Sequence, residues 1–409
     1  MNTFIDTRTI RRKTPYIAMF VVLATSGAFG FSPPEATDKI DAEPVVLTRP
    51  DGSPAPALLE NLYVATKDQP GLMQRPPADP DISSEGVAAG VQPDDLTPGY
   101  VLFEGDIQLR PEEIDYGVEG APRAVFGTVN YWGATVPYDF AANVSTTNQQ
   151  NAINAMNAIS ARAGVTFRLR VGGDPDWIRF NASTFNNSPV GRQGGQQIIN
   201  IVSWGTQIII VHELYHSLGF WHEQSAPDRG TFVTINFGNV CGASSVPGNP
   251  CNPNVCQGCA DAQNNFISCA FNFNTTAGAG VWGGYDFDSF MHYGRTAFSC
   301  NGGDTITVNA AWNAQWQSLI GQRDHFSLLD ELSCRGIYPF VGDRWLRIGP
   351  GGSNVGTFFN PFIGTFTTAC NATPQNGTLL IDPGTYSGIG TYSQAKTVRA
   401  TFGTVVIGN

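Results

Sequence analysis

Three of the five histidines in this chain lie within eleven residues of one another, from His212 to His222. His212 and His216 are four residues apart, so on a helix they share one face and can bind a single metal ion. Gly219 allows the chain to leave that helix through a positive φ angle, which can return His222 to the same ion as a third ligand. The spacing therefore predicts a metal site made of three imidazoles.

Three neutral ligands leave one coordination position open, which is typical of a catalytic zinc site. Water bound at such a site has a pKa of about 7 and becomes a nucleophile at neutral pH. Glu213 follows the first histidine and can act as the general base that takes a proton from this water and passes it to the leaving amine. The alternatives are a structural zinc site and a chance occurrence of the pattern. The added Gly219 and His222 favour the catalytic site.

A second segment, residues 285–294 (YDFDSFMHYG), supports this interpretation. We expect Met291, in a tight turn, to form an apolar floor beneath the three imidazoles. Tyr293 can bind the zinc at rest and move to stabilise the oxyanion in the transition state. Without the histidine motif upstream, the same two residues would indicate ordinary core packing.

The run HELYHSLGFWHEQSAPDR (212–229), taken with SFMHYG (289–294), resembles the astacin family of zinc metallopeptidases, which belongs to the metzincins. Glu223, directly after the third histidine, is the mark of that family, and WGATVPY (132–138) is similar to the start of its mature domain. The resemblance covers about residues 122–342. It implies an α+β fold: a bilobed catalytic domain with a mixed twisted β-sheet, an active-site helix and one Zn2+ at the floor of a cleft.

The resemblance also implies a role for each residue of the motif. The implied zinc ligands are His212, His216 and His222, with Glu213 as general base and Tyr293 as a switchable fifth ligand. Structural support of the site is implied for Gly219, Glu223 and Met291.

Residues 31–121 are acidic and rich in proline, with 18 acidic residues, five basic residues, 13 of the 27 prolines and no cysteine. Such a stretch buries too little apolar surface for a core of its own, so it is either a linker or a propeptide. Residues 103–106 (FEGD) match the FxGD motif of astacin propeptides, which implies that Asp106 binds the zinc in place of water as a zymogen latch. The alternative is that Asp106 belongs to a simple turn. Family activation buries a new N-terminus near Glu223, and a cut near Arg123 fits that scheme.

Residues 1–30 have the parts of an export signal: a basic start, an apolar run over 17–31 and small residues at its end. A membrane anchor and a buried helix are the alternatives. A cleaved signal predicts a secreted, extracellular protein with no membrane span after its removal. The net charge of −11 argues against a nucleic-acid partner, because binding to phosphates needs basic surfaces.

All eight cysteines lie between residues 241 and 370, and an even number in an exported chain predicts disulfides. Five of them fall in 241–269, which we interpret as a disulfide-bonded insertion in the catalytic domain. A zinc knuckle at Cys256 and Cys259 is the alternative. The pairing of the cysteines does not follow from the sequence.

Helices and strands alternate over 122–342, and residues 343–409 form a small all-β module similar in texture to a parallel β-helix. Strands are predicted at 131–138, 165–171, 177–181, 197–203, 378–381, 397–400 and 404–407, and helices at 148–163, 206–218 and 327–334.

These observations favour a secreted zinc endopeptidase that is made as a zymogen, acts on protein or peptide substrates and is inhibited by its own propeptide. The alternative is a catalytically idle secreted protein that binds surfaces or other proteins through residues 343–409. A zinc hydrolase acting on a non-peptide bond is a third reading. The endopeptidase is preferred because neither a metal ligand nor Glu213 has been lost.

Overall fold

The computed structural model describes residues 96–97, 99–103, 106–110, 114–115, 123–124, 129–241, 269–276, 282–348, 355–388 and 394–408, together with one short strand, β1 (Val21–Leu23). Most of the predicted export signal, most of the pro-segment (31–121) and residues 242–268 of the predicted insertion lie outside this description. The chain divides into two compact units, one containing residues 75–160 and 165–333 and the other containing residues 161–164 and 334–409. No helix among the described residues is long and apolar enough to cross a membrane.

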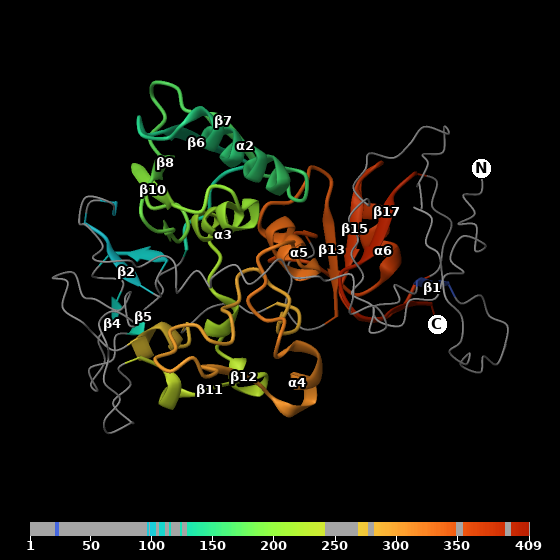
Figure 1. Cartoon of the computed structure of the whole chain (residues 1–409). Helices are drawn as coiled ribbons and strands as arrows, with labels where there is room; N and C mark the ends of the chain where they lie inside the picture. The colour runs from blue at the N-terminus through green and yellow to red at the C-terminus, as the bar shows by residue number, and fades with distance from the viewer. Residues whose placement is uncertain are drawn as a thin grey trace, which may run out of the picture. The chain divides into compact units, whose positions relative to one another are not determined.

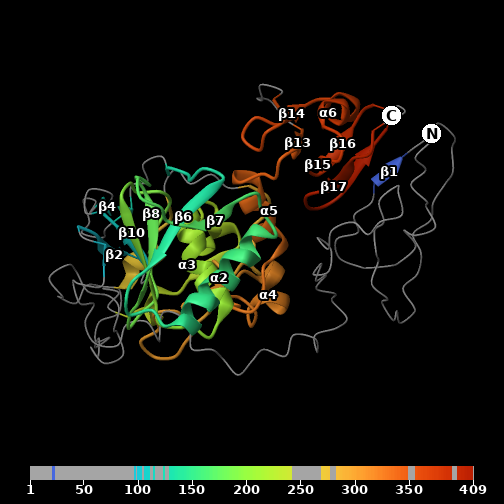
Figure 2. The same cartoon turned by 90° about the horizontal axis from the view of Figure 1, so that it is seen from above.

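The larger unit contains a four-stranded sheet in the order β10-β8-β6-β7, in which all neighbouring strands are parallel. Its strands are β6 (Thr135–Phe140), β7 (Thr166–Leu169), β8 (Trp177–Ala182) and β10 (Gln196–Ile201). At the outer edge of β10, an isolated antiparallel bridge joins Asn187 to Asn200. Two helices, α2 (Thr146–Ser160) and α3 (Gln207–Leu218), lie side by side next to this sheet (Figures 1 and 2).

Both helices form where the sequence predicts them. The inner face of α2 consists of Ala152, Ala155, Met156 and Ile159, whose spacing repeats every three or four residues. Helix α3 is different, because every residue from Ile208 to Leu218 is buried. A helix that is buried on all sides lies in the core of its unit. The metal motif therefore sits on a central element and not on a loop.

The rest of the larger unit is less regular. Its elements are η3 (Glu223–Ser225), η4 (Arg229–Thr231), β11 (Val233–Ile235), η5 (Phe237–Asn239), η6 (Cys269–Phe273), β12 (Ile306–Val308), α4 (Ala310–Trp316) and the first part of α5 (Leu328–Ile337). Strands β11 and β12 pair antiparallel. Cys269 is disulfide-bonded, whereas Cys300 carries a thiol. The prediction that all cysteines form disulfides is therefore wrong for Cys300, and it is also wrong for Cys370 in the other unit.

The pro-segment contributes short strands. These are β2 (Val101–Phe103), β3 (Ile107–Leu109) and β4 (Ile114–Asp115). Strands β2 and β3 form a sheet with β9 (Ser188–Pro189), and β4 pairs with β5 (Arg123–Ala124), which follows the pro-segment. Strand β3 is antiparallel to β2 and parallel to β9. The part of the pro-segment around Asp106 is thus integrated into the sheet structure of the larger unit.

The smaller unit is built from parallel strands, as its β-prone sequence indicates. They are β13 (Arg344–Arg347), β14 (Phe362–Ile363), β15 (Thr378–Ile381), β16 (Gly384–Tyr386), β17 (Thr397–Ala400) and β18 (Val405–Ile407), and β1 pairs with β18. The unit also contains a helix, α6 (Phe366–Ala372), so the all-β description is incomplete. The Thr365 side chain caps α6, and Phe366, Ala369 and Cys370 are buried at helical spacing. The overall α+β class is confirmed.

Candidate metal centre

Helix α3 places His212 and His216 on one face, with ring centroids 4.7 Å apart. The helix ends at Gly219, which has a φ of 107° and donates its N–H to the carbonyl of His216. A Cβ at this position would lie 2.8 Å from Cε1 of Tyr131. Glycine is therefore required both by the left-handed conformation and by the lack of space.

The turn after Gly219 returns His222 to the helix, as the sequence predicts. Its ring centroid lies 4.7 Å from that of His216 and 5.3 Å from that of His212. All three imidazoles are buried. The structure thus brings the three histidines of the motif together in one solvent-excluded site.

Hydrogen bonds fix the tautomers of the two helix histidines. Nδ1 of His212 lies 2.9 Å from the carbonyl oxygen of Phe290, and Nδ1 of His216 lies 2.8 Å from that of Phe220. Because a carbonyl oxygen only accepts, each Nδ1 carries the hydrogen and each Nε2 presents a lone pair. Burial lowers the pKa of His212 to about 4 and that of His216 well below its ordinary value, so both rings are neutral.

The two lone pairs face each other, because Nε2 of His216 lies only 3.1 Å from Nε2 of His212. Neither nitrogen can donate to the other, so this approach is favourable only when a cation lies between them. Zinc–nitrogen bonds of about 2.0–2.1 Å at a tetrahedral angle separate two ligands by about 3.3 Å. The observed separation fits a pair of zinc ligands.

Asp106 supplies a fourth ligand atom. Its Oδ2 lies 3.3 Å from Nε2 of His212 and 3.2 Å from Nε2 of His222, and its buried Oδ1 has no hydrogen-bond partner in the part of the chain that the structure describes. The ligand atoms of Asp106, His212, His216 and His222 all lie within 4.8 Å of one another. Burial raises the pKa of Asp106, but the imidazoles of His222, His212 and His216 together lower it well below its usual range. A carboxylate oxygen and imidazole nitrogens are ligands that Zn2+ binds in proteins.

Glu213 lies beside this group on α3. Its side chain is fully buried, and neither carboxylate oxygen has a hydrogen-bond partner among the described residues. Burial, and secondarily the negative charge of Asp106, raises the pKa of Glu213 well above its ordinary value. A carboxyl group without fixed partners is available for proton transfer to a bound molecule.

The second predicted segment, around Met291, packs against the histidine segment. The backbone N–H of Glu223 donates to the carbonyl of Met291, and the N–H of Tyr293 donates to Oε1 of Gln224. The Tyr293 ring is buried with its centroid 4.5 Å from that of His222. Tyr293 therefore lies beside the metal ligands. The roles of Met291 as an apolar floor and of Tyr293 as a fifth ligand remain predictions.

Two carboxyl groups, those of the buried Asp330 and the half-buried Glu223, hold this segment through hydrogen bonds. Asp330 accepts hydrogen bonds from the Ser289 hydroxyl at 2.6 Å and the Phe290 N–H at 3.1 Å, and Glu223 accepts from the N–H of Asp286 at 2.7 Å. Burial raises the pKa of Asp330 to about 6 and that of Glu223 to about 8. The sequence motif marks Glu223 but not Asp286 or Asp330, because only the fold brings these three residues together.

A buried amide, Gln108, holds the pro-segment at the edge of β10. Its Nε2 donates to Oδ1 of Asn187 at 2.5 Å and to the carbonyl of Ile198 at 2.9 Å, and its Oε1 accepts from the N–H of Thr97 at 2.8 Å. The hydroxyl oxygen of Thr97 in turn accepts from the N–H of Ile198 at 3.0 Å. We call Gln108, Thr97 and Asn187 the amide cluster. Sequence reasoning missed it, although the apolar-polar-apolar order of residues 107–109 is typical of a two-faced strand.

Comparison with known proteins identifies the same segment of the chain as the geometry does. The family model of the astacin peptidases matches residues 126–245 and 261–339, which include the three histidines, Glu213 and Tyr293. The chain belongs to the astacin family. Astacins are zinc metallopeptidases, so the matched residues form a peptidase domain of a zinc-dependent family, and the cluster of Asp106, His212, His216 and His222 is a group that could hold the ion.

The astacin domain is similar to several curated proteins. It is 32% identical over 239 residues to zinc metalloproteinase nas-13 of Caenorhabditis elegans, covering 55% of this chain and 47% of that protein. It is 33% identical over 198 residues to high choriolytic enzyme 1 of Oryzias latipes, covering 48% and 62%. The solved structure of that hatching enzyme zinc-protease matches with 30% identity and a TM-score of 0.40, covering 50% of this chain and 92% of that one. The chain thus spans about half the length of the curated relatives it matches.

Proposed function

We propose that this protein is a secreted zinc endopeptidase, made as a zymogen, that hydrolyses peptide bonds in protein or peptide substrates. The observation that carries the proposal is the approach of the two neutral Nε2 atoms of His212 and His216 to 3.1 Å, next to a buried carboxyl group without partners at Glu213. A metal ion explains the first feature, and proton transfer explains the second.

The proposed roles follow from these positions. His212, His216 and His222 hold the zinc, which when bound polarises the scissile carbonyl and lowers the pKa of water. Glu213 takes the proton from the attacking water and delivers it to the leaving amine. Tyr293, beside His222, donates to the oxyanion as it develops.

Inhibition by the pro-segment is proposed from the contacts of Asp106. Its carboxylate lies within 3.3 Å of two of the imidazole nitrogens, where it takes the fourth ligand position and leaves no place for water. The amide cluster supports this position, because Gln108 and Thr97 bond both the carbonyl and the N–H of Ile198 on β10. These backbone groups lie at the edge of the sheet, where an extended substrate can add as a further strand.

Secretion and activation are proposed from the sequence. The basic and apolar start of the chain directs export, and a cut near Arg123 removes the pro-segment so that the new N-terminus lies near Glu223. The raised pKa of the half-buried Glu223 carboxyl indicates a group that gains from a cationic partner.

One experiment tests the proposal. The full chain is expressed, the secreted product is sequenced from its N-terminus, and casein hydrolysis is measured before and after processing, with and without a chelator. We expect one zinc ion per chain, little hydrolysis by the unprocessed chain, and chelator-sensitive hydrolysis by the processed one. A processed, zinc-loaded protein that cleaves no peptide bond would refute the proposal and favour a non-catalytic binding role.

A further inference from the structure

Strand β3 has an apolar face, formed by Ile107 and Leu109, and a polar face, formed by Gln108. Ile107 is fully buried and Leu109 is 3% exposed, and both belong to one hydrophobic cluster, whereas Gln108 joins the amide cluster. Ile107 directly follows Asp106, whose carboxylate lies among the imidazoles. Ile107 also shares its buried cluster with Tyr293, whose ring centroid lies 4.5 Å from that of His222.

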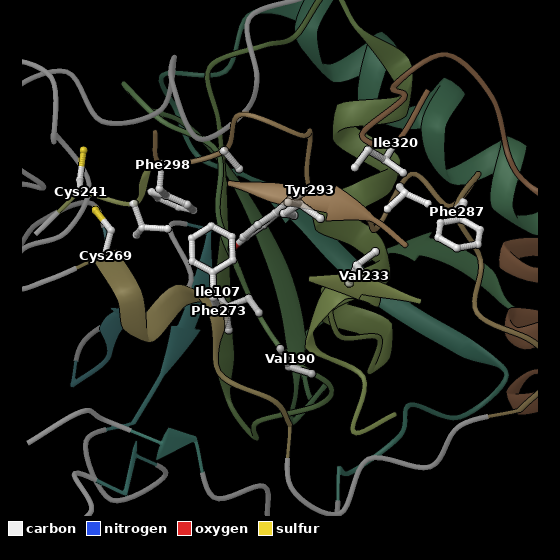
Figure 3. Packing of buried hydrophobic residues seen from close by; sticks show 14 of the residues in the cluster. Ile107, Val190, Val233, Cys241, Cys269, Phe273, Phe287, Tyr293, Phe298 and Ile320 are labelled. Carbon is white, nitrogen blue, oxygen red and sulfur yellow. The ribbon is translucent and has the colours of Figure 1, made fainter. Parts of the chain in front are cut away.

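Three aromatic rings, those of Phe273, Tyr293 and Phe298, belong to the same cluster as Ile107, and we call them the aromatic wall. The ring centroids of Phe273 and Tyr293 are 6.0 Å apart, those of Phe273 and Phe298 are 5.9 Å apart, and those of Tyr293 and Phe298 are 5.5 Å apart. In Figure 3, Ile107, Phe273 and Tyr293 belong to the same cluster of buried side chains. Because Tyr293 also packs against His222, this aromatic wall adjoins the zinc site.

Phe298 adopts a conformation that bulky residues rarely take. Its φ is +54°, in the left-handed region, and its carbonyl accepts a hydrogen bond from the N–H of Cys241 at 3.0 Å. Strained backbone persists only where the surrounding structure requires it, and it is common at ligand-binding sites. At Phe298, the strained backbone belongs to a residue whose ring packs against those of Phe273 and Tyr293.

We propose that the space now filled by Ile107 is the substrate subsite next to the scissile bond, and that it takes an aliphatic side chain. The inference rests on the proposed function and adds a substrate preference to it. A peptide whose scissile carbonyl takes the place of the Asp106 carboxylate brings a neighbouring side chain to the position of Ile107. An aliphatic side chain is stabilised there by burial, whereas a charged one loses its hydration.

Arg229 is the group that would favour an acidic side chain instead. Its Nη1 donates to the carbonyls of Gln224 at 2.8 Å and Asn274 at 3.4 Å, and its Nη2 donates to the carbonyl of Phe273. The guanidinium therefore already has main-chain acceptors beside the aromatic wall. It braces Phe273 and does not need a substrate carboxylate as a partner.

The test uses the processed full-length protein and one peptide scaffold. At each position flanking the cleaved bond, the scaffold carries Leu, Ile, Asp or Lys in turn, and kcat/KM is measured for each. We expect Leu and Ile to exceed Asp and Lys at least tenfold at one flanking position. Equal kcat/KM values for the four peptides, or a preference for Asp or Lys at both positions, would overturn the proposal of an aliphatic subsite. If no peptide is cleaved, it is the proposed function that fails.

Two variants test whether the preference for aliphatic side chains depends on Phe273. Phe273→Leu opens the wall, and we expect it to reduce the Leu-to-Asp ratio of kcat/KM at least fivefold. Phe287→Leu removes the same atoms from the other end of the cluster in Figure 3 and should leave the ratio unchanged. Equal ratios in both variants would overturn the assignment of Phe273 to the subsite, and the peptide series decides the preference even if a variant fails to fold.

Discussion

The Nε2 atoms of His212 and His216 lie 3.1 Å apart, and each ring donates its Nδ1 hydrogen to a main-chain carbonyl. The two nitrogens that face each other therefore carry only lone pairs. Their approach is unfavourable in the absence of a cation and favourable in its presence. The folded state of the larger unit is thus linked to metal binding.

Removal of zinc should therefore destabilise the protein as well as inactivate it. With free zinc at about 1,000 times its Kd, the ion adds about 4 kcal/mol to the free energy of unfolding. We expect a chelator to lower the melting temperature by several degrees and zinc to restore it, with calcium ineffective because it prefers oxygen ligands. Calorimetry with metal analysis measures this, and an unchanged melting temperature in the metal-free protein would contradict it.

Glu213→Ala should abolish peptide hydrolysis while zinc remains bound. Loss of a general base typically lowers kcat by a factor of about 100 to 10,000. The readouts are the kcat of the processed protein and its zinc content. Glu331→Ala, which removes a carboxylate from helix α5, serves as the control and should retain activity. Turnover at the normal rate in Glu213→Ala would exclude Glu213 as the base.

Asp106→Ala should weaken the latency of the unprocessed chain. The substitution removes the oxygen that lies 3.2 Å from His222 and frees the fourth ligand position for water. We expect the activity of the intact chain to rise at least tenfold relative to that of the processed protein. Asp174→Ala breaks an exposed ion pair with Arg168 and should change nothing. Full latency in Asp106→Ala would remove Asp106 from the inhibitory contact.

Gln108→Leu should loosen the pro-segment without touching the zinc ligands. It leaves the carbonyl of Ile198 and the N–H of Thr97 without their partner, at a cost of about 1–3 kcal/mol. That cost corresponds to a shift of about 5- to 150-fold toward the open form, measured as activity of the intact chain. Gln150→Leu, on the exposed side of α2, is the matched control. Equal latency in the two variants would argue against the amide cluster.

His325 predicts a pH dependence of stability outside the zinc site. Burial opposes its charge, but hydrogen bonds to Asp288 and Asp324 raise its pKa to about 10. A raised pKa means that the stabilisation is complete below the unfolded pKa of about 6.5 and is lost as the pH rises toward 10. His325→Gln should therefore destabilise the protein at pH 6 and much less at pH 10 in urea unfolding. A constant difference across this range would contradict the assignment.

The clustering of the three histidines could be predicted because the spacing of 212–222 is local. A helix fixes His212 relative to His216, and a left-handed Gly219 fixes the return of His222. The helices and strands with clear periodicity were predictable for the same reason, and strands β15 and β17 have the predicted bounds.

Contacts between distant segments could not be predicted. Gln108 meets Asn187 across 79 residues, and Ser289 meets Asp330 across 41, so no local pattern marks these pairs. Helix α6 is too short for its three buried positions to stand out in a β-prone region. The thiols of Cys300 and Cys370 depend on which cysteines the fold brings together.

Helix α3 is enclosed from Ile208 to Leu218, so its amides can exchange with solvent only when the surrounding core opens. His212, Glu213 and His216 can therefore leave their positions only when the core of the unit opens. At a given temperature, the rate at which peptidase activity is irreversibly lost should equal the rate of global unfolding of the larger unit.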